Sequence, residues 1–170
     1  MIKTIVKRFY KEWKSFGLDD ITIFRTPASL NISGSLPITS ITNHHSITTN
    51  ATLASLFPDQ QSVCLMLDAH LPEKLPLNRS TCVYTFSQLF SVLMAPLALI
   101  VDLDSHQFIV RQSQILSGDT FFSTQQFLVA VQQLIPLLHK SIFYLHENCS
   151  AAEVENIVSH LHKKFYSEVV

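Results

Sequence analysis

Eight histidines are the first side chains in this sequence that could bind a metal ion or transfer a proton. His44 and His45 are adjacent, and neighbouring residues on a strand point to opposite faces. His139 and His146 are seven residues apart and would share one face of a helix. None of these residues comes with carboxylates at a spacing typical of metal ligands. We therefore expect solvated or core histidines, with no metal and no cofactor.

The three cysteines, Cys64, Cys82 and Cys149, are the candidate nucleophiles. Cys64 lies in an apolar stretch, where burial keeps a thiol protonated and unreactive. Cys82 precedes a predicted helix and is the best candidate for a hydrolase or transferase, but no motif surrounds it. An odd number of cysteines without a CxxC pair indicates free thiols in a reducing compartment.

Acidic residues and glycines do not form a recognisable active site either. Asp102 and Asp104 alternate with apolar residues at a predicted turn, where we expect them to point into solvent. The three glycines lie too far apart to form a phosphate-binding loop. The sequence therefore predicts that the protein is not an enzyme.

The composition favours a protein that binds other proteins. Apolar residues make up 47% of the chain and charged residues 15%, against about 25% charged residues in a typical soluble protein. The formal net charge of -1 does not favour binding to nucleic acid, which needs a basic face to displace counterions. Such a composition indicates apolar surface that an oligomer or a partner covers.

Length and hydropathy predict a single cytoplasmic domain. A chain of 170 residues can form one domain with its own core, here over residues 1–170. We find no secretory signal, and no run approaches the ~18–20 apolar residues that cross a bilayer.

Residues 2–16 have the spacing of an amphipathic helix that ends at Gly17. Its apolar stripe consists of Ile2, Ile5, Val6, Phe9, Trp13 and Phe16. The helix also carries five basic residues. We favour a helix that packs on the core and exposes its lysines. A helix on an anionic membrane surface and a groove for a partner segment are the alternatives.

Strand patterns follow this helix. Residues 21–24 form a short candidate strand, and residues 62–71 form a strand with two apolar faces that should lie centrally in a sheet. Residues 28–58 contain no charged side chain. We interpret them as one or two strands with turns at 33–35 and 43–45, part of them a possible insertion or mobile loop.

The second half of the chain alternates helices with one hairpin. A helix is predicted over residues 85–94, with Thr85 and Gln88 as its capping box. Two β-rich runs, 97–103 and 107–116, form a hairpin. Ser123 caps a long helix that contains Pro136, and Ser150 with Glu153 caps a C-terminal helix. The fold class is α+β, with a mostly antiparallel sheet and helices packed on one face.

The stretch from Ser62 to His146 resembles the YbjN-like and type III secretion chaperone-like domains of bacteria. The segments that carry this resemblance are SVCLMLDAHLP, TFSQLFSVLM, LALIVDLDSHQFIVRQSQILSG and STQQFLVAVQQLIPLLHKSI. Their order is a strand, a helix, a hairpin with an acidic turn, and an amphipathic helix. The resemblance implies the element order α-β-β-β-α-β-β-α, to which this chain adds a C-terminal helix. The near-neutral charge and the uncharged stretch 28–58 depart from the family pattern.

The resemblance also implies a function without catalysis. Such chaperones are commonly homodimers that bind an unfolded segment of a secreted effector. Carried over by element, the client contacts are Phe9, Trp13, Phe16, Ile21 and Phe24. The dimer interface is then the neighbouring strand or the middle helix, with Phe86, Leu89, Phe90 and Leu93. Our hypothesis from the sequence is a dimeric cytoplasmic chaperone or adaptor. The alternative is a membrane-surface or regulatory adaptor that acts through the first helix.

Overall fold

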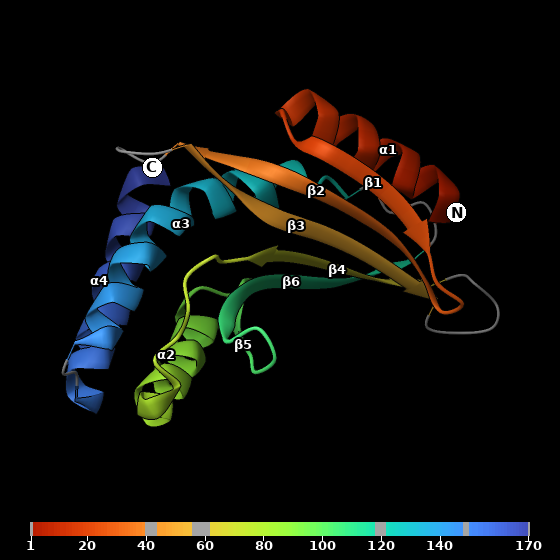
Figure 1. Ribbon diagram of the computed structural model, residues 1–170. Helices are drawn as coiled ribbons and strands as arrows, with labels where there is room; N and C mark the ends of the chain where they lie inside the picture. The colour runs from red at the N-terminus through yellow and green to blue at the C-terminus, as the bar shows by residue number, and fades with distance from the viewer. Residues whose placement is uncertain (1, 40–43, 56–61, 118–121, 148–149, 170) are drawn as a thin grey trace. The chain divides into compact units, whose positions relative to one another are not determined.

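The computed structural model describes residues 2–39, 44–55, 62–117, 122–147 and 150–169 (Figure 1). Its elements are α1 (Ile2–Phe16), β1 (Asp19–Arg25), β2 (Ser29–Thr39), β3 (His44–Ser55), β4 (Ser62–His70), the short 3-10 helix η1 (Leu77–Arg79), α2 (Ser80–Leu93), β5 (Ala98–Asp102), β6 (Gln107–Ser117), α3 (Gln125–His146) and α4 (Ala151–Val169). Six strands and four α-helices confirm the predicted α+β class.

The strands form one sheet in the order β1-β2-β3-β4-β6-β5. Antiparallel pairing joins β1 to β2, β2 to β3, β3 to β4, and β5 to β6. The predicted central strand is β4, which lies between β3 and β6, so this prediction is confirmed. The strands at the two edges are β1 and β5.

The contacts divide the chain into two compact units, although the sequence predicted a single domain. Unit 1 consists of Met1–Ala69 and Gln112–Ala130, and unit 2 consists of His70–Arg111 and Val131–Val170. Each unit is described by itself.

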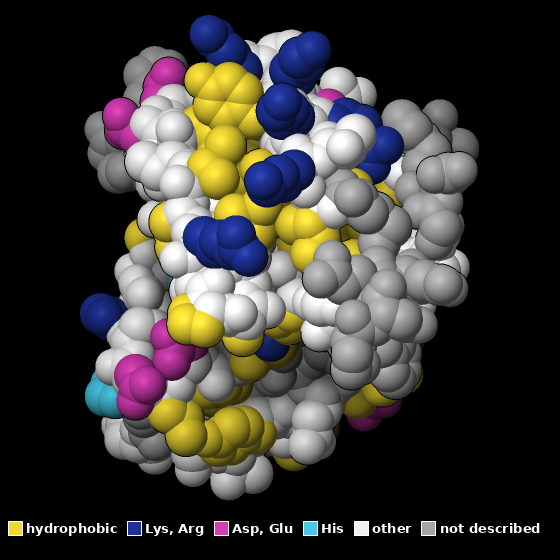
Figure 2. Space-filling model, turned by 90° about the vertical axis from the view of Figure 1, so that its right-hand side faces the viewer, with side chains coloured by type: hydrophobic (Ala, Val, Ile, Leu, Met, Phe, Trp, Pro, Cys, Tyr) yellow, Lys and Arg dark blue, Asp and Glu magenta, His cyan; other side chains and the backbone are white. Residues whose placement is uncertain are grey.

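In unit 1, helix α1 covers one face of the strands. Ile5, Val6, Phe9 and Trp13 are buried, and so are Ile32, Leu36, Ala51 and Leu53 on the strands. The lysines of α1 are exposed. Figure 2 shows Lys and Arg side chains gathered on the side of the molecule where α1 lies. This arrangement confirms the interpretation of α1 as a helix that packs on the core.

Within the uncharged stretch 28–58, Ser29–Thr39 and His44–Ser55 form the paired strands β2 and β3, which contribute Ile32, Leu36, Ala51 and Leu53 to the core. The register runs from Ser29↔Ala54 to Thr39↔His44. The predicted turn at 33–35 was wrong, because these residues lie inside β2. Leu18 and Trp13 lie close above Gly34 and leave little space for a side chain there. A Cβ added there would be 3.2 Å from Leu18 Cδ2 and 3.3 Å from Trp13 Cε3. The second predicted turn covered residues 43–45. His44 and His45 belong to β3, and residue 43 lies outside the described residues.

Unit 2 contains β5 and the first residues of β6, which form the predicted hairpin, together with α2, α4 and most of α3. Asp102 accepts hydrogen bonds from the Ser105 hydroxyl (2.6 Å) and the Asp104 N–H (3.1 Å), which close the turn. Both bonds hold the pKa of Asp102 below its ordinary value. The rings of Phe86 on α2 and Phe108 on β6 lie 5.7 Å apart in the core.

Two predicted helix starts need correction. Helix α2 begins at Ser80, so Thr85 and Gln88 lie within it and form no capping box. Helix α3 begins at Gln125, one residue later than a cap at Ser123 implies, although the Ser123 hydroxyl does accept from the Gln125 N–H at 3.3 Å. The predicted cap of α4 is confirmed: Glu153 N–H donates to the Ser150 hydroxyl, and the Glu153 carboxylate accepts from Ser150 N–H.

Helix α3 continues through Pro136 and is strongly apolar. Within the described parts of the chain it is the one helix long and apolar enough to cross a membrane. Of its most apolar window, 44% is buried inside the protein. A core helix has the same properties, and the buried positions of α3 recur at the three- and four-residue spacing of a packed face.

Candidate functional site

Two of the five predicted client contacts belong to the core of unit 1. Phe9 and Trp13 have no exposed surface. Trp13 also donates its indole N–H to the Thr124 hydroxyl at 3.1 Å. In this fold the chain's own core covers both side chains, which an amphipathic stripe does not reveal, and their contact with a client stays a prediction. Phe16 and Ile21 are half-buried, and only Phe24 is strongly exposed, at 51%.

The predicted dimer interface on α2 is also divided between core and surface. Phe86 and Phe90 are fully buried and cannot contact a second copy in this fold. Leu89 is half-buried and Leu93 is 40% exposed. The most exposed apolar side chain of this helix is Val92, which the sequence analysis did not select.

The strongest candidate site is a groove in unit 2 that we call the α3–α4 groove. Its volume is about 660 Å³. Helix α3 contributes Leu137, His139, Lys140, Ser141, Phe143 and Tyr144, and helix α4 contributes Asn156, Ile157, His160, Leu161 and Lys164. The two helices run side by side here (Figure 1).

The groove has aromatic side chains that water still reaches. Phe143 is 61% exposed and Tyr144 is 54% exposed, and their rings meet edge to face at 6.3 Å. Both lie outside the buried stripe of α3, which includes Leu138, Ile142 and Leu145. Exposed neighbouring aromatic residues of this kind are typical of binding surfaces.

The lysines that line the α3–α4 groove are both positively charged, and the one carboxylate bonded to a lining residue is that of Glu73, at His139. Lys140 and Lys164 line it together with His139 and His160, and no carboxylate is among its lining residues. Within the described residues neither lysine forms an ion pair. The groove therefore offers two positive charges for an anionic ligand.

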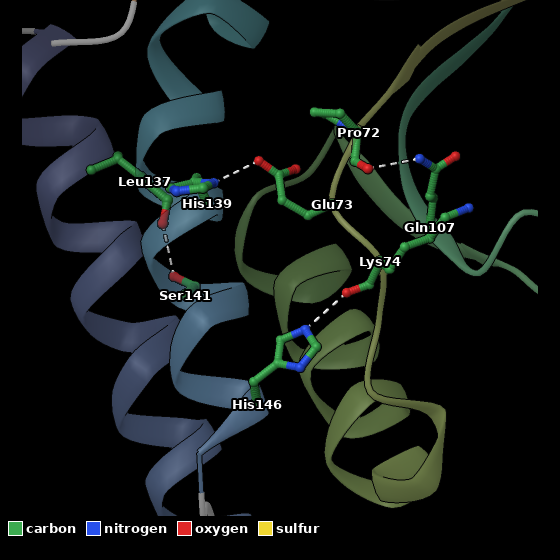
Figure 3. Close-up of polar contacts among 8 residues, drawn as sticks. All are labelled: Pro72, Glu73, Lys74, Gln107, Leu137, His139, Ser141 and His146. Atoms are coloured by element: carbon green, nitrogen blue, oxygen red, sulfur yellow. Dashed lines mark hydrogen bonds and ion pairs between the residues drawn. The ribbon is translucent and has the colours of Figure 1, made fainter. Parts of the chain in front are cut away.

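Two histidines on one face of α3 position this part of the helix (Figure 3). His139 Nδ1 lies 2.6 Å from the Glu73 carboxylate. His146 Nε2 donates to the Lys74 carbonyl at 2.8 Å. The sequence analysis predicted that these histidines share a face, and here that face meets the segment after β4.

The segment after β4, whose Glu73 and Lys74 bond to the two histidines, is itself hydrogen-bonded to β6 and the β5–β6 turn. Leu71 N–H donates to the Phe108 carbonyl and Leu75 N–H to the His106 carbonyl, both at 2.9 Å. The Gln107 side-chain amide donates to the Pro72 carbonyl at 2.9 Å (Figure 3). These bonds hold α3, and with it one wall of the groove, on a fixed support.

The polar groups near this site do not assemble into a catalytic arrangement. The His139–Glu73 pair could orient a general base, but the nearby Ser141 hydroxyl donates to the Leu137 carbonyl of its own helix at 2.9 Å (Figure 3). Cys82 lies in the first turn of α2 and Cys64 on β4, and neither lines the groove. Over the described parts of the chain, no three His, Cys, Asp or Glu residues gather to hold a metal ion.

Sequence reasoning missed the residues that define the groove. One signal was available: Phe143 and Tyr144 directly follow Ile142, which makes the apolar surface of α3 wider than one helix face. On α4, His160 and Lys164 stand four residues apart and so share a face. No sequence pattern shows that these two faces adjoin.

The fold and the groove together define an α+β protein with a cationic, aromatic groove between two helices. No family model, no curated protein and no solved structure matches this chain. The resemblance to secretion chaperone-like domains therefore stays a prediction.

Proposed function

We propose that this protein is a non-enzymatic protein-binding module whose partner segment is an acidic amphipathic helix lying in the α3–α4 groove. The observation that carries the proposal is the combination of exposed Phe143 and Tyr144 with Lys140 and Lys164 in a groove without carboxylates. The apolar side chains select for an apolar stripe on the partner, and the lysines select for acidic residues beside it.

The aromatic pair supplies the affinity in this proposal. Covering an aromatic side chain removes a large apolar area from water, at about 25 cal/mol per Å². Aromatic residues at the centre of an interface commonly dominate its binding energy. Phe143 and Tyr144 are also close enough to contact one partner side chain together, since their rings lie 6.3 Å apart.

The shape of the site favours a helical partner. A groove between two neighbouring helices accepts a third helix, whose side chains fit between the ridges of the other two. A second copy of the same groove is a poor occupant, because it would place lysines against lysines. An acidic helix meets both requirements, since its carboxylates can lie beside Lys140 and Lys164.

A chaperone for a secreted protein is one specific form of this proposal. The groove supports the binding of a partner segment, whereas the pathway and the compartment rest on the sequence resemblance alone. Co-expression with neighbouring secreted proteins tests that specific form. A membrane-surface adaptor that acts through α1 is less well supported, because Phe9 and Trp13 are buried and only the lysine face of α1 is available.

The experiment uses a fluorescent synthetic peptide with leucines at helical spacing and glutamates at the flanking positions. We expect fluorescence polarisation to report saturable binding to the full chain. The double variant Lys140→Glu, Lys164→Glu should weaken binding at least about tenfold, which corresponds to about 1.4 kcal/mol. Phe143→Ala should also weaken it, without the strong dependence on salt that the lysine effect shows.

Lys163→Glu is the matched control for charge, because Lys163 is exposed on α4 but does not line the groove. A peptide with lysines in place of the glutamates is the control for the ligand. The proposal is overturned if the peptide binds equally well to the double variant and to Lys163→Glu. It is also overturned if the chain does not bind the peptide but floats with phosphatidylserine vesicles, and the double lysine variant does not float. That result would indicate that the groove binds a membrane surface.

A further inference from the structure

We propose that two copies of this chain associate by antiparallel pairing of their β1 edge strands, about a two-fold axis at Thr22. The proposal does not depend on the α3–α4 groove, because β1 belongs to unit 1 and the groove to unit 2. It assigns the second copy to a different element from the α2 helix that the sequence resemblance implied.

Strand β1 has an unpaired edge. It is the first strand of the sheet, and among the described strands it pairs only with β2. Thr26 N–H donates to the Ser29 carbonyl at 2.9 Å where the β1–β2 hairpin closes. Because hydrogen-bonded and non-hydrogen-bonded pairs alternate in an antiparallel ladder, the N–H and C=O groups of Ile23 and Arg25 point away from β2. These groups can bond to another strand.

Strand β1 carries two strongly exposed apolar side chains beside its three charged residues. Ile23 is 47% exposed and Phe24 is 51% exposed, and they point to opposite faces of the sheet. Natural edge strands are commonly protected by lysine, proline or a bulge. The register shift and the positive φ of Asp20 lie between Asp19 and Thr22, the half of the strand that faces Thr22–Arg25 of the other copy. Thr22 to Arg25 keep a regular register with β2.

The charges of β1 are self-complementary. Asp19 and Asp20 lie at one end of the strand and Arg25 at the other. In an antiparallel pair centred on Thr22, Ile21 of each copy faces Ile23 of the other. The acidic end of each copy then lies beside Arg25 of the other, at both ends of the pair. A parallel pair would place acid beside acid and arginine beside arginine, which is unfavourable.

The interface that this proposal describes is small. One pair of seven-residue strands buries less than the ~1,200 Å² typical of stable protein interfaces. We therefore expect a weak dimer that forms as the protein concentration rises.

Charge reversal tests the proposed register. In sedimentation velocity over a concentration series, Asp19→Arg alone and Arg25→Asp alone should each raise the dimer dissociation constant, at least about threefold, because each places like charges beside each other at both ends. The double variant Asp19→Arg, Arg25→Asp should restore association. Circular dichroism verifies that each variant folds, and both changed side chains are exposed on β1.

A cysteine crosslink tests the position of the axis. Facing residues of a non-hydrogen-bonded antiparallel pair have Cα atoms about 4.5 Å apart, within the range of a disulfide. Thr22→Cys should therefore form a disulfide-linked dimer under mild oxidation, above the level given by the unsubstituted chain. Ser113→Cys is the control, because Ser113 is exposed on β6, and it should not form a disulfide-linked dimer above that level.

Restored association in the double charge variant together with the Thr22→Cys crosslink supports the proposal. A chain that stays monomeric at all concentrations overturns it. So does a dimer that neither single charge reversal weakens, because that dimer uses another surface.

Discussion

The Glu12 carboxylate accepts two hydrogen bonds from Thr124, one from the backbone N–H at 2.9 Å and one from the hydroxyl at 2.7 Å. These residues are 112 positions apart in the chain. The Thr124 hydroxyl also accepts the indole N–H of Trp13. One buried threonine thus joins the middle of α1 to the start of α3, and caps α3 with a carboxylate from another helix.

Thr124→Val removes the hydroxyl bonds of this junction while it keeps the shape of the side chain. The Trp13 N–H loses its acceptor, and the Glu12 oxygen loses the hydroxyl bond but keeps the bond from the Thr124 backbone N–H, so we expect a loss of about 1–3 kcal/mol in the free energy of unfolding. Urea denaturation followed by tryptophan fluorescence measures it, since the chain has a single tryptophan. Thr4→Val, at an exposed position of α1, is the control and should change stability by less than about 0.5 kcal/mol. Equal stabilities for the two variants would show that the junction contributes nothing.

Gly34→Ala adds a methyl group where Leu18 and Trp13 already lie within 3.3 Å of its position. We expect a cost of about 1–3 kcal/mol, because the atoms above β2 must move to make space. The measurement is the midpoint of thermal unfolding. Ser35→Ala, one residue further on and half-buried on the other face of β2, should have a smaller effect. If Gly34→Ala proves as stable as the unsubstituted chain, then α1 does not pack on β2 as described.

The cap of α4 predicts that the stability of the folded protein depends on pH. Hydrogen bonds from the Ser150 backbone and side chain hold the pKa of Glu153 below its ordinary value. A group whose pKa is lower in the folded state stabilises that state above its unfolded pKa, and this contribution disappears as the pH falls through the folded pKa. Glu153→Gln should therefore be less stable than the unsubstituted chain at neutral pH. The difference should shrink as the pH falls into the acidic range.

Urea unfolding at a series of pH values, with helicity read by circular dichroism, tests this cap. Glu155→Gln is a suitable control, because Glu155 is exposed on the same helix and outside the cap. A difference for Glu153→Gln that is constant with pH would contradict the role given to its carboxylate.

Local patterns predicted the elements whose causes are local. The spacing of Ile5, Phe9 and Trp13 gave α1, and the alternation of Val63, Leu65 and Leu67 gave β4. The cap formed by Ser150 and Glu153 was also visible, because a capping box needs only residues three apart.

The errors concern features whose causes are distant in the chain. Gly34 was interpreted as a turn residue, but it lies in β2, paired with Thr49 of β3 and covered by Trp13 and Leu18. Thr124, just before α3, donates its N–H to Glu12, a partner that no window around α3 contains. Helix α2 was predicted too short because its N-cap residue, Arg79, makes no side-chain capping bond that a sequence pattern would show.

The candidate site was the least predictable feature for the same reason. Apolar spacing identified Phe9 and Trp13, yet it could not show whether a partner or the chain's own core covers them. The α3–α4 groove depends on two helix faces that adjoin only in the folded protein. Its charge pattern became evident only when Lys140 and Lys164 were seen to line one groove.

The most direct test of the proposed function is a two-dimensional ¹H–¹⁵N NMR titration of the full chain with the acidic amphipathic peptide. We predict that the amide signals of Lys140, Phe143, Tyr144, His160 and Lys164 shift progressively to saturation, while those of the lysines on α1 stay unchanged. Shifts confined to α1, or no shifts at all, would contradict the assignment of the α3–α4 groove as the binding site.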